Sequence, residues 1–264
     1  MNLDISPTLL ESVRQIARRA GDAIMEVYSR EFAVELKDDR SPLTEADKAA
    51  HTIIAAGLAA LAEPLPILSE ESSADDISGR RGWSTYWLVD PLDGTKEFIK
   101  RNGEFTVNIA LIHNHEPKLG VVYAPAIDRL YSGVVGAGAW LEGDGEAASA
   151  IQTQPLSSRP LRVVGSRSHA SDALAGYLAS LGAHSMVPMG SSLKICLVAE
   201  GKADVYPRLG PTSEWDTAAA HAVLLSAGGG MIDTAGEPLR YNTKDDLLNP
   251  HFVAYGDGTR SWLS

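Results

Sequence analysis

Residues 87–95 read Trp-Leu-Val-Asp-Pro-Leu-Asp-Gly-Thr, an apolar strand that runs into an acidic turn. Pro91 fixes its own φ and is expected to end the strand. Asp90 and Asp93 stand three residues apart around this turn, so their carboxylates can converge, and Leu92 offers a backbone carbonyl beside them. Hard oxygen ligands of this kind suit Mg²⁺ better than a soft metal. The turn therefore predicts a magnesium site at the end of a strand.

The residues after the turn predict a phosphate site next to the metal. Gly94 permits a sharp entry into a short helix that begins at or near Thr95 and runs through Lys100. Free backbone N–H groups at the start of a helix favour an anion. The plainer alternative is an Asp-rich turn in which Thr95 only caps the helix.

Apolar spacing on both sides of this turn predicts an α+β first half and an α/β second half. The first half has helices at 7–28 and 45–61, then strands at 67–68, 86–89, 105–112, 119–123, 130–135 and 139–141. The second half alternates strands at 161–165, 184–189 and 203–206 with helices at 172–181, 191–200 and 217–226, and a strand follows at 252–255. Residues 143–160 are predicted to connect two lobes, 1–145 and 146–264.

Composition excludes several classes of function. The chain has 264 residues, of which 44% are hydrophobic, and a net charge of −11, which makes it a poor ligand for nucleic acid or anionic lipid. Cys196 is the only cysteine, so neither an intrachain disulfide nor a zinc site built on thiolates is expected. The N-terminus lacks the features of a signal peptide, and the longest apolar run, 53–62, is half a membrane span. A cytoplasmic location without a transmembrane segment is expected.

Three further acidic segments accompany the turn, and each has a purely structural explanation when taken alone. Thr44 and Asp47 fit a helix capping box. Glu70 and Glu71 follow a short strand, where surface acids are common. Asp216 precedes an alanine-rich helix, whose dipole it would complement.

Together these segments resemble the inositol monophosphatase superfamily of Mg²⁺-dependent, lithium-sensitive phosphatases. The resemblance rests on Asp-Pro-Leu-Asp-Gly-Thr at 90–95, Trp-Asp at 215–216 and Glu-Glu at 70–71, in this order along nearly the whole chain. It implies a layered αβαβα sugar-phosphatase fold with two lobes and a metal site between them. Residues 96–98, 102–108, 166–169 and 190–194 resemble, within that superfamily, the 3′(2′),5′-bisphosphate nucleotidases of the bacterial CysQ type.

The resemblance implies a role for each motif residue. Glu70, Asp90 and the Leu92 carbonyl would hold one Mg²⁺, and Asp90, Asp93 and Asp216 a second, with a third transient ion left open. Asp47 and Thr95 would orient and deprotonate the attacking water. The residues implied in substrate binding are Glu70, Leu92, Asp93, Gly94, Thr95, Ser166, His169, Gly190, Ser191, Lys194 and Asp216.

The implied reaction is hydrolysis of 3′-phosphoadenosine 5′-phosphate to AMP and phosphate, in sulfate assimilation. The 5′-phosphosulfate of the same nucleotide is a further candidate substrate. Lys194 is expected to meet the 5′-phosphate, although a surface lysine is the alternative. Lys37, Arg167 and Arg208 are further candidates for phosphate.

Other functions remain open at this point. The chain could be an inositol monophosphatase or another sugar phosphatase, or a regulatory protein that binds Mg²⁺ or a nucleotide without turnover. Family members of this branch lie in the cytoplasm or loosely on the inner face of the inner membrane. The sequence does not give the oligomeric state.

Overall fold

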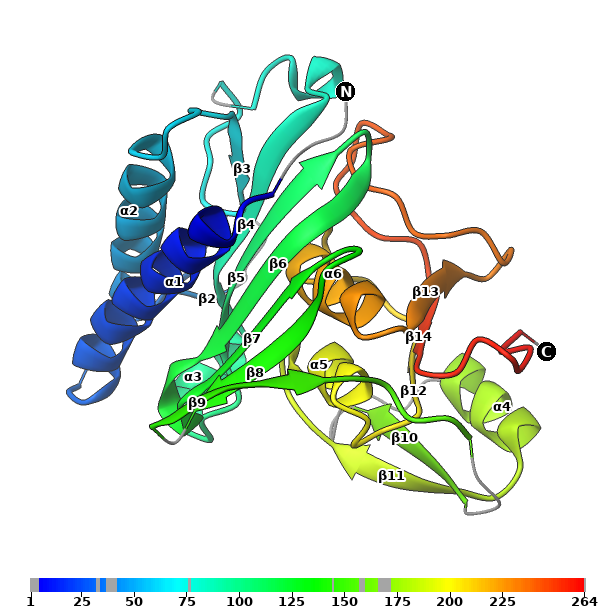
Figure 1. Ribbon diagram of the computed structural model, residues 1–264. Coiled ribbons are helices and arrows are strands. Elements are labelled where there is room, and N and C mark those ends of the chain that lie inside the picture. The colour runs from blue at the N-terminus through cyan, green and yellow to red at the C-terminus, as the bar shows by residue number, and fades with distance from the viewer. Residues whose placement is uncertain are drawn as a thin grey trace.

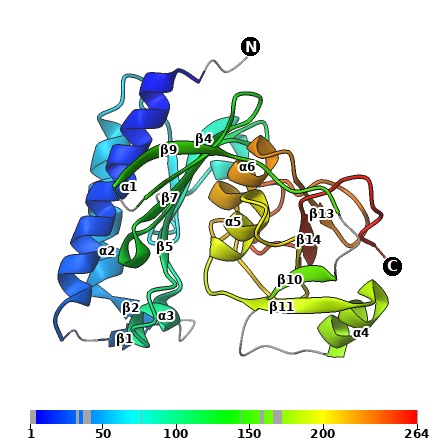
Figure 2. The ribbon, with the colours of Figure 1, turned by 60° about the horizontal axis from the view of Figure 1, so that its bottom comes forward.

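The computed structural model describes residues 5–31, 34–36, 42–75, 77–143, 145–156, 160–165 and 172–263. Figure 1 and Figure 2 show five layers in them: two long helices, a large sheet, two further helices, a smaller sheet and an outer helix. The expected layered αβαβα architecture is confirmed.

The first layer consists of α1 (Pro7–Tyr28) and α2 (Glu45–Ala59), which lie side by side on one face of the large sheet. The hydroxyl of Ser6 accepts a hydrogen bond from the backbone N–H of Leu9 at 3.1 Å, and Pro7 takes the first helical position. Both helices were predicted within two residues of these bounds.

The large sheet has seven strands in the sequential order β3-β4-β5-β6-β7-β8-β9. All neighbours are antiparallel except β3 and β4. Successive residues of β5 face opposite layers, so Ile109 and Leu111 pack with α1 and α2, and Ala110 and Ile112 pack with the helices on the other side. The strands are β3 (Ile67–Ser69), β4 (Thr85–Asp93), β5 (Thr106–His113), β6 (Glu116–Ala124), β7 (Arg129–Val134), β8 (Gly138–Gly143) and β9 (Glu146–Ile151).

Strand β9 corrects the prediction that residues 143–160 are only a connection. Its residues are exposed or half-buried and lack an apolar alternation, because β9 is an edge strand that contacts β8 on one side. The backbone ladder holds it in the sheet without an apolar face that the sequence could reveal.

The smaller sheet has the order β11-β10-β12-β14-β13. Helices α5 and α6 lie between the two sheets, and α4 covers the outer face of the smaller one (Figure 1). The short strand β13 was not predicted. The elements are β10 (Leu161–Gly165), α4 (Asp172–Leu181), β11 (His184–Pro188), α5 (Leu193–Ala199), β12 (Val205–Arg208), α6 (Ala218–Ser226), β13 (Gly230–Asp233) and β14 (Phe252–Tyr255).

One buried core joins both halves of the chain. It combines Tyr86 and Leu88 of β4 with Leu193 of α5 and Leu224 of α6. The division into lobes at 145/146 stays a prediction. The remaining elements are β1 (Val34–Leu36), β2 (Pro42–Thr44), α3 (Thr95–Ile99), and the 3₁₀ turns η1 (Arg80–Gly82) and η2 (Pro125–Ile127).

Candidate active site

The acidic turn lies at the end of β4 and contains a bulge. Asp90 pairs with Asn108 of β5 and Asp93 pairs with Thr106, so two residues on β4 oppose one on β5. The prediction that Pro91 ends the strand is therefore wrong: proline is tolerated where a bulge interrupts the ladder. The backbone N–H of Leu92 donates to Asp90 Oδ1 at 3.0 Å, which fixes the orientation of that carboxylate.

The second half of the chain brings Asp216 to this turn. Asp216 lies just before α6, and its Oδ2 accepts the backbone N–H of Ser213 at 2.9 Å. One carboxylate oxygen from each of Asp90, Asp93 and Asp216 lies within 4.8 Å of the others. Asp90 and Asp216 are 126 positions apart in the chain, so the cluster is a product of the tertiary fold.

The electrostatics of this cluster favour a cation. Burial, followed by repulsion from Glu70, Asp93 and Asp216, raises the pKa of Asp90 well above its usual range. Burial and the charge of Asp93 raise the pKa of Asp216 to about 8. Burial raises the pKa of Asp93 to about 6, against the opposing effects of Lys194 and the Ser192 N–H. Buried carboxylates that repel one another are the setting in which a divalent ion with oxygen ligands is stabilised.

Glu70 and Leu92 lie beside the cluster. The backbone N–H of Glu70 donates to the carbonyl of Val89 at 3.1 Å, which places Glu70 next to the end of β4. Its negative charge raises the pKa of Asp90, Asp93 and Asp216. Leu92 is buried, and its carbonyl accepts the hydroxyl of Thr95 at 3.3 Å.

Asp47 belongs to the first turn of α2, where the expected capping box is present. Asp47 Oδ2 accepts the backbone N–H of Thr44 at 2.8 Å and its hydroxyl at 2.7 Å, and the Thr44 hydroxyl accepts the N–H of Ala46. Asp47 also lies near enough to the cluster to raise the pKa of Asp90. Thr95 opens α3 as predicted. A joint role of Asp47 and Thr95 stays a prediction.

A cavity of about 150 Å³ adjoins the cluster on the side of the second half. Gly94, with φ 89°, lets the chain turn from β4 into α3 at its wall, since L side chains rarely adopt this φ. Its lining includes seven residues of the predicted substrate and phosphate set, namely Asp93, Gly94, Gly190, Ser191, Lys194, Arg208 and Asp216.

Among the described residues, Lys194 is one of three cationic residues that line this cavity, with Lys96 and Arg208. Its side chain is buried, with 9% exposed, and its Nζ lies 5.7 Å from the ring centre of Tyr206. Burial lowers the pKa of Lys194, and the charge of Asp93 opposes this shift. The alternative of a surface lysine is therefore wrong. Another of these cations, Arg208, donates to the carbonyl of Pro211 at 2.6 Å.

Seven of the residues that line the cavity were not in the predicted substrate and phosphate set, namely Lys96, Glu97, Ser192, Ile195, Tyr206, Thr212 and Thr217. The backbone N–H of Ser192 donates to Asp93, and its hydroxyl donates to Asn108 at 2.8 Å, so Ser192 fastens α5 to the acidic turn. Its place between Ser191 and Lys194 was the available signal. Tyr206 lines the cavity from β12, and nothing in its strand pattern distinguishes it from a core residue.

Several predicted residues lie outside the described part of the chain. They are Ser166 and His169 among the substrate residues, and Lys37 and Arg167 among the further phosphate candidates. Among the helices that the structure does describe, none is long and apolar enough to cross a membrane.

Known proteins resemble the chain over almost its full length. It is 54% identical over 249 residues to the 3′(2′),5′-bisphosphate nucleotidase CysQ of Escherichia coli K12, covering 92% of this chain and 98% of that protein. It is 53% identical over 247 residues to the enzyme of the same name from Salmonella typhimurium, with the same coverage. The crystal structure of CysQ from Bacteroides thetaiotaomicron, a bacterial member of the inositol monophosphatase family, superposes with a TM-score of 0.82 at 44% identity, over 94% of this chain and 97% of that one.

The family model describes the same span in which the acidic turn, Asp216 and the cavity lie. It is the model of the inositol monophosphatase family, and it matches residues 7–257. The two sheets and the cluster of three aspartates lie within that span. The chain therefore belongs to the inositol monophosphatase family.

Proposed function

We propose that the chain is a phosphomonoesterase that hydrolyses the 3′-phosphate of 3′-phosphoadenosine 5′-phosphate, giving AMP and phosphate. The observation that carries this proposal is that the negative aspartate cluster adjoins a cavity lined by cationic side chains. Asp93 and Asp216 of the three-aspartate cluster line the same cavity as Lys194 and Arg208. The names of the relatives from Escherichia coli and Salmonella typhimurium support the substrate.

The donor set of the cluster fits Mg²⁺. Its ligands are carboxylates, to which Glu70 and the Leu92 carbonyl are added as candidates, and such all-oxygen sets suit hard divalent cations. The family is metal-dependent. Two ions are proposed, one held by Glu70, Asp90 and Leu92 and the other by Asp90, Asp93 and Asp216, with a third transient ion left open. When bound, such ions would neutralise phosphate charge and lower the pKa of a water molecule toward neutrality.

The protein's own residues would prepare the attack of water on the phosphorus. The hydroxyl of Thr95 is too weak a base to act alone, so we assign the proton to a relay from water through Thr95 to the carboxylate of Asp47. In the structure Asp47 is held in place by Thr44, which limits the orientations of its carboxylate. The water oxygen bonds to phosphorus as the bond from phosphorus to the ribose 3′ oxygen breaks, and in net terms the proton taken from the water goes to that oxygen, which leaves AMP and phosphate.

Lys194 and Arg208 are assigned to the second phosphate. Both line the same cavity, and the Nε of Arg208 is buried without a hydrogen-bond partner among the described residues. A buried guanidinium nitrogen of this kind is satisfied by an anion in the cavity. This cationic pair favours a bisphosphate over a monophosphate of inositol. A cytoplasmic location, with or without attachment to the inner membrane, stays an expectation from the sequence.

The test is phosphate release from four compounds: 3′-phosphoadenosine 5′-phosphate, 5′-AMP, inositol 1-phosphate and fructose 1,6-bisphosphate. The first should be preferred over the two monophosphates by at least one decade in kcat/KM, on the basis of about 1.5–3 kcal/mol for a charged hydrogen bond to the second phosphate. It should also be preferred over fructose 1,6-bisphosphate, in line with the names of the relatives. Excess chelator should stop turnover, and millimolar Li⁺ should lower it. Preference for either sugar phosphate would favour a sugar phosphatase, and binding without release would favour a regulatory protein.

A further inference from the structure

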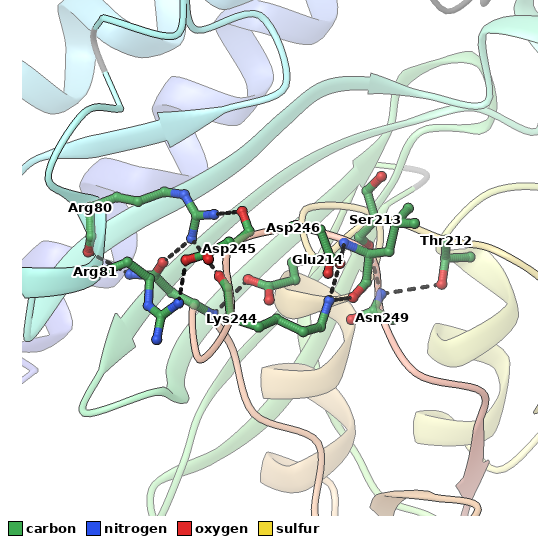
Figure 3. Close-up of polar contacts among 11 residues, drawn as sticks. Arg80, Arg81, Thr212, Ser213, Glu214, Lys244, Asp245, Asp246 and Asn249 are labelled. Carbon is green, nitrogen blue, oxygen red and sulfur yellow. Dashed lines mark hydrogen bonds and ion pairs between the residues drawn. The ribbon is translucent and has the colours of Figure 1, made fainter.

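Arg80 is a buried cation outside the site described above. It lies in η1 with 7% of its surface exposed. Its guanidinium donates to Asn242 Oδ1. It also donates to the carbonyl of Lys244 at 3.2 Å and to the carbonyl of Asp245 (Figure 3). A buried charge is tolerated when hydrogen bonds satisfy it, and here the acceptors all come from one segment near the C-terminal end.

Asn242 also donates a hydrogen bond to Arg80. Its Nδ2 donates to the backbone carbonyl of Arg80 at 2.6 Å, so each residue bonds to the other through its side chain. Asn242 is fully buried and has φ 56°, a conformation that asparagine and glycine adopt more readily than other residues. The two residues are 162 positions apart in the chain.

The same segment is fastened to the turn that carries Asp216. The backbone N–H of Asn242 donates to Glu214 Oε2 at 2.7 Å, and Glu214 is 1% exposed. The N–H of Glu214 donates to the carbonyl of Leu247 at 2.8 Å. Asn249 donates through Nδ2 to the carbonyl of Ser213 at 2.7 Å, as Figure 3 shows beside its contact with Thr212. The N–H of Ser213 in turn donates to Asp216 itself.

The other end of this chain of contacts leads to Glu70. In the part of this loop that the structure describes, the backbone N–H of Ile77 donates to the carbonyl of Ser73 at 3.4 Å, and the N–H of Arg80 donates to the carbonyl of Ile77 at 3.1 Å. Glu70 at their start contacts Val89 of β4. The residues Arg80, Asn242 and Glu214, which we call the latch, thus join the loop that follows Glu70 to the turn that carries Asp216.

We propose that Arg80 and Asn242 are positioning residues for the metal site: the latch fixes the separation of Glu70 and Asp216 across the two halves of the chain. The inference rests on the metal dependence in the proposed function. Residues that orient metal ligands are typically worth 10–100-fold in metal affinity. The latch contributes its effect before substrate arrives, so it acts on metal binding by the protein alone.

The test compares three variants with the unmodified protein. Asn242→Gly deletes the side chain, keeps the N–H that Glu214 accepts and tolerates φ 56°. Arg80→Met removes the guanidinium and keeps an unbranched side chain. Arg81→Met is the matched control, because Arg81 is 48% exposed and pairs with the fully exposed carboxylate of Asp245.

Three measurements are made on each protein: the Mg²⁺ isotherm by calorimetry without substrate, the Mg²⁺ concentration for half-maximal phosphate release from 3′-phosphoadenosine 5′-phosphate, and urea unfolding of the metal-free protein. We expect Asn242→Gly and Arg80→Met to weaken Mg²⁺ about tenfold or more in the first two measurements. Turnover should return close to the unmodified level at saturating Mg²⁺. Arg81→Met should change none of these.

An unchanged Mg²⁺ isotherm for Asn242→Gly, accompanied only by a lower unfolding free energy, would overturn the proposal and leave the latch a stabilising contact. If Arg80→Met does not fold, Asn242→Gly alone decides. The isotherm tests the latch independently of turnover. Absence of phosphate release from the unmodified protein, with Mg²⁺ bound, would therefore refute the proposed function and not the latch.

Discussion

Replacing Lys194 with methionine tests the assignment of the second phosphate. Methionine keeps most of the side-chain volume that packs on Tyr206 and removes the charge. The side chain is 9% exposed and lines the cavity, so water would replace its ammonium poorly as a partner for phosphate. The 5′-phosphate is remote from the bond that is cleaved, and a lost contact there should lower kcat/KM for substrates that carry it.

The magnitude has two parts. A charge-assisted hydrogen bond contributes about 1.5–3 kcal/mol, which corresponds to about one to two decades in kcat/KM for 3′-phosphoadenosine 5′-phosphate. Lys194 also holds the pKa of Asp93 down, so its removal should change the metal site in the same way for every substrate. The second part is common to all substrates and cancels when two of them are compared.

The assay is therefore a ratio. We measure kcat/KM for 3′-phosphoadenosine 5′-phosphate and for 3′-AMP at one Mg²⁺ concentration and ionic strength, in Lys194→Met and in Arg208→Met. The ratio should fall by about one to two decades in both variants. Lys100→Met, an exposed lysine after α3, is the matched control and should leave the ratio unchanged. An unchanged ratio in Lys194→Met, whatever the loss in each rate, would refute the assignment.

Three other outcomes follow from the structure. Asp47→Asn and Thr95→Ala should each lower kcat, and the double variant should be little worse than the more damaging single one, because two members of one relay are lost together; additive losses would separate them. Burial lowers the pKa of His221 to about 3, so the unfolded chain binds more protons than the folded one between pH 6.5 and 3. The free energy of unfolding should therefore decrease as the pH is lowered through that window, by up to about 1.4 kcal/mol per pH unit. Urea unfolding at pH 6.5 and 4.5 should show a shallower pH slope for His221→Gln, and equal slopes would contradict the shift. Gly120→Ala would place Cβ 2.1 Å from the carbonyl oxygen of Ala219, so its unfolding free energy should drop by about 1–3 kcal/mol or more, and an unchanged urea midpoint would show that α6 moves freely on β6.

The local signals in the sequence were sufficient to predict most of the helices and strands. Ser6 and Pro7 mark the start of α1, and the buried stripe that includes Val13, Ile16 and Ile24 follows the helical period that predicted it. Gly94 predicted the sharp entry into α3. Caps, turns and hydrophobic periods act over a few residues, so each can be read without knowledge of the rest of the fold.

The same locality explains the errors. Pro91 does interrupt regular pairing, but β4 continues past it through a bulge opposite β5, and a single strand carries no information about its partner. Strand β9 has no apolar face and only one β-branched residue, Ile151. Its backbone pairing with β8 is what holds it as a strand. Lys194 follows a serine pair at the start of a helix, a setting equally common at a surface.

The sequence by itself determined the ligand chemistry, because Asp90, Leu92 and Asp93 meet within one turn. Only the tertiary structure brought a carboxylate oxygen of Asp216 to within 4.8 Å of those of Asp90 and Asp93, buried Lys194 beside them and placed Arg208 in the same cavity. That convergence depends on α5 and α6 packing between two sheets, where the carbonyl of Ala219 approaches Gly120 so closely that no side chain fits. Contacts of this kind join residues about a hundred positions apart, and they arise from the packing of complete layers, which no short stretch of sequence encodes.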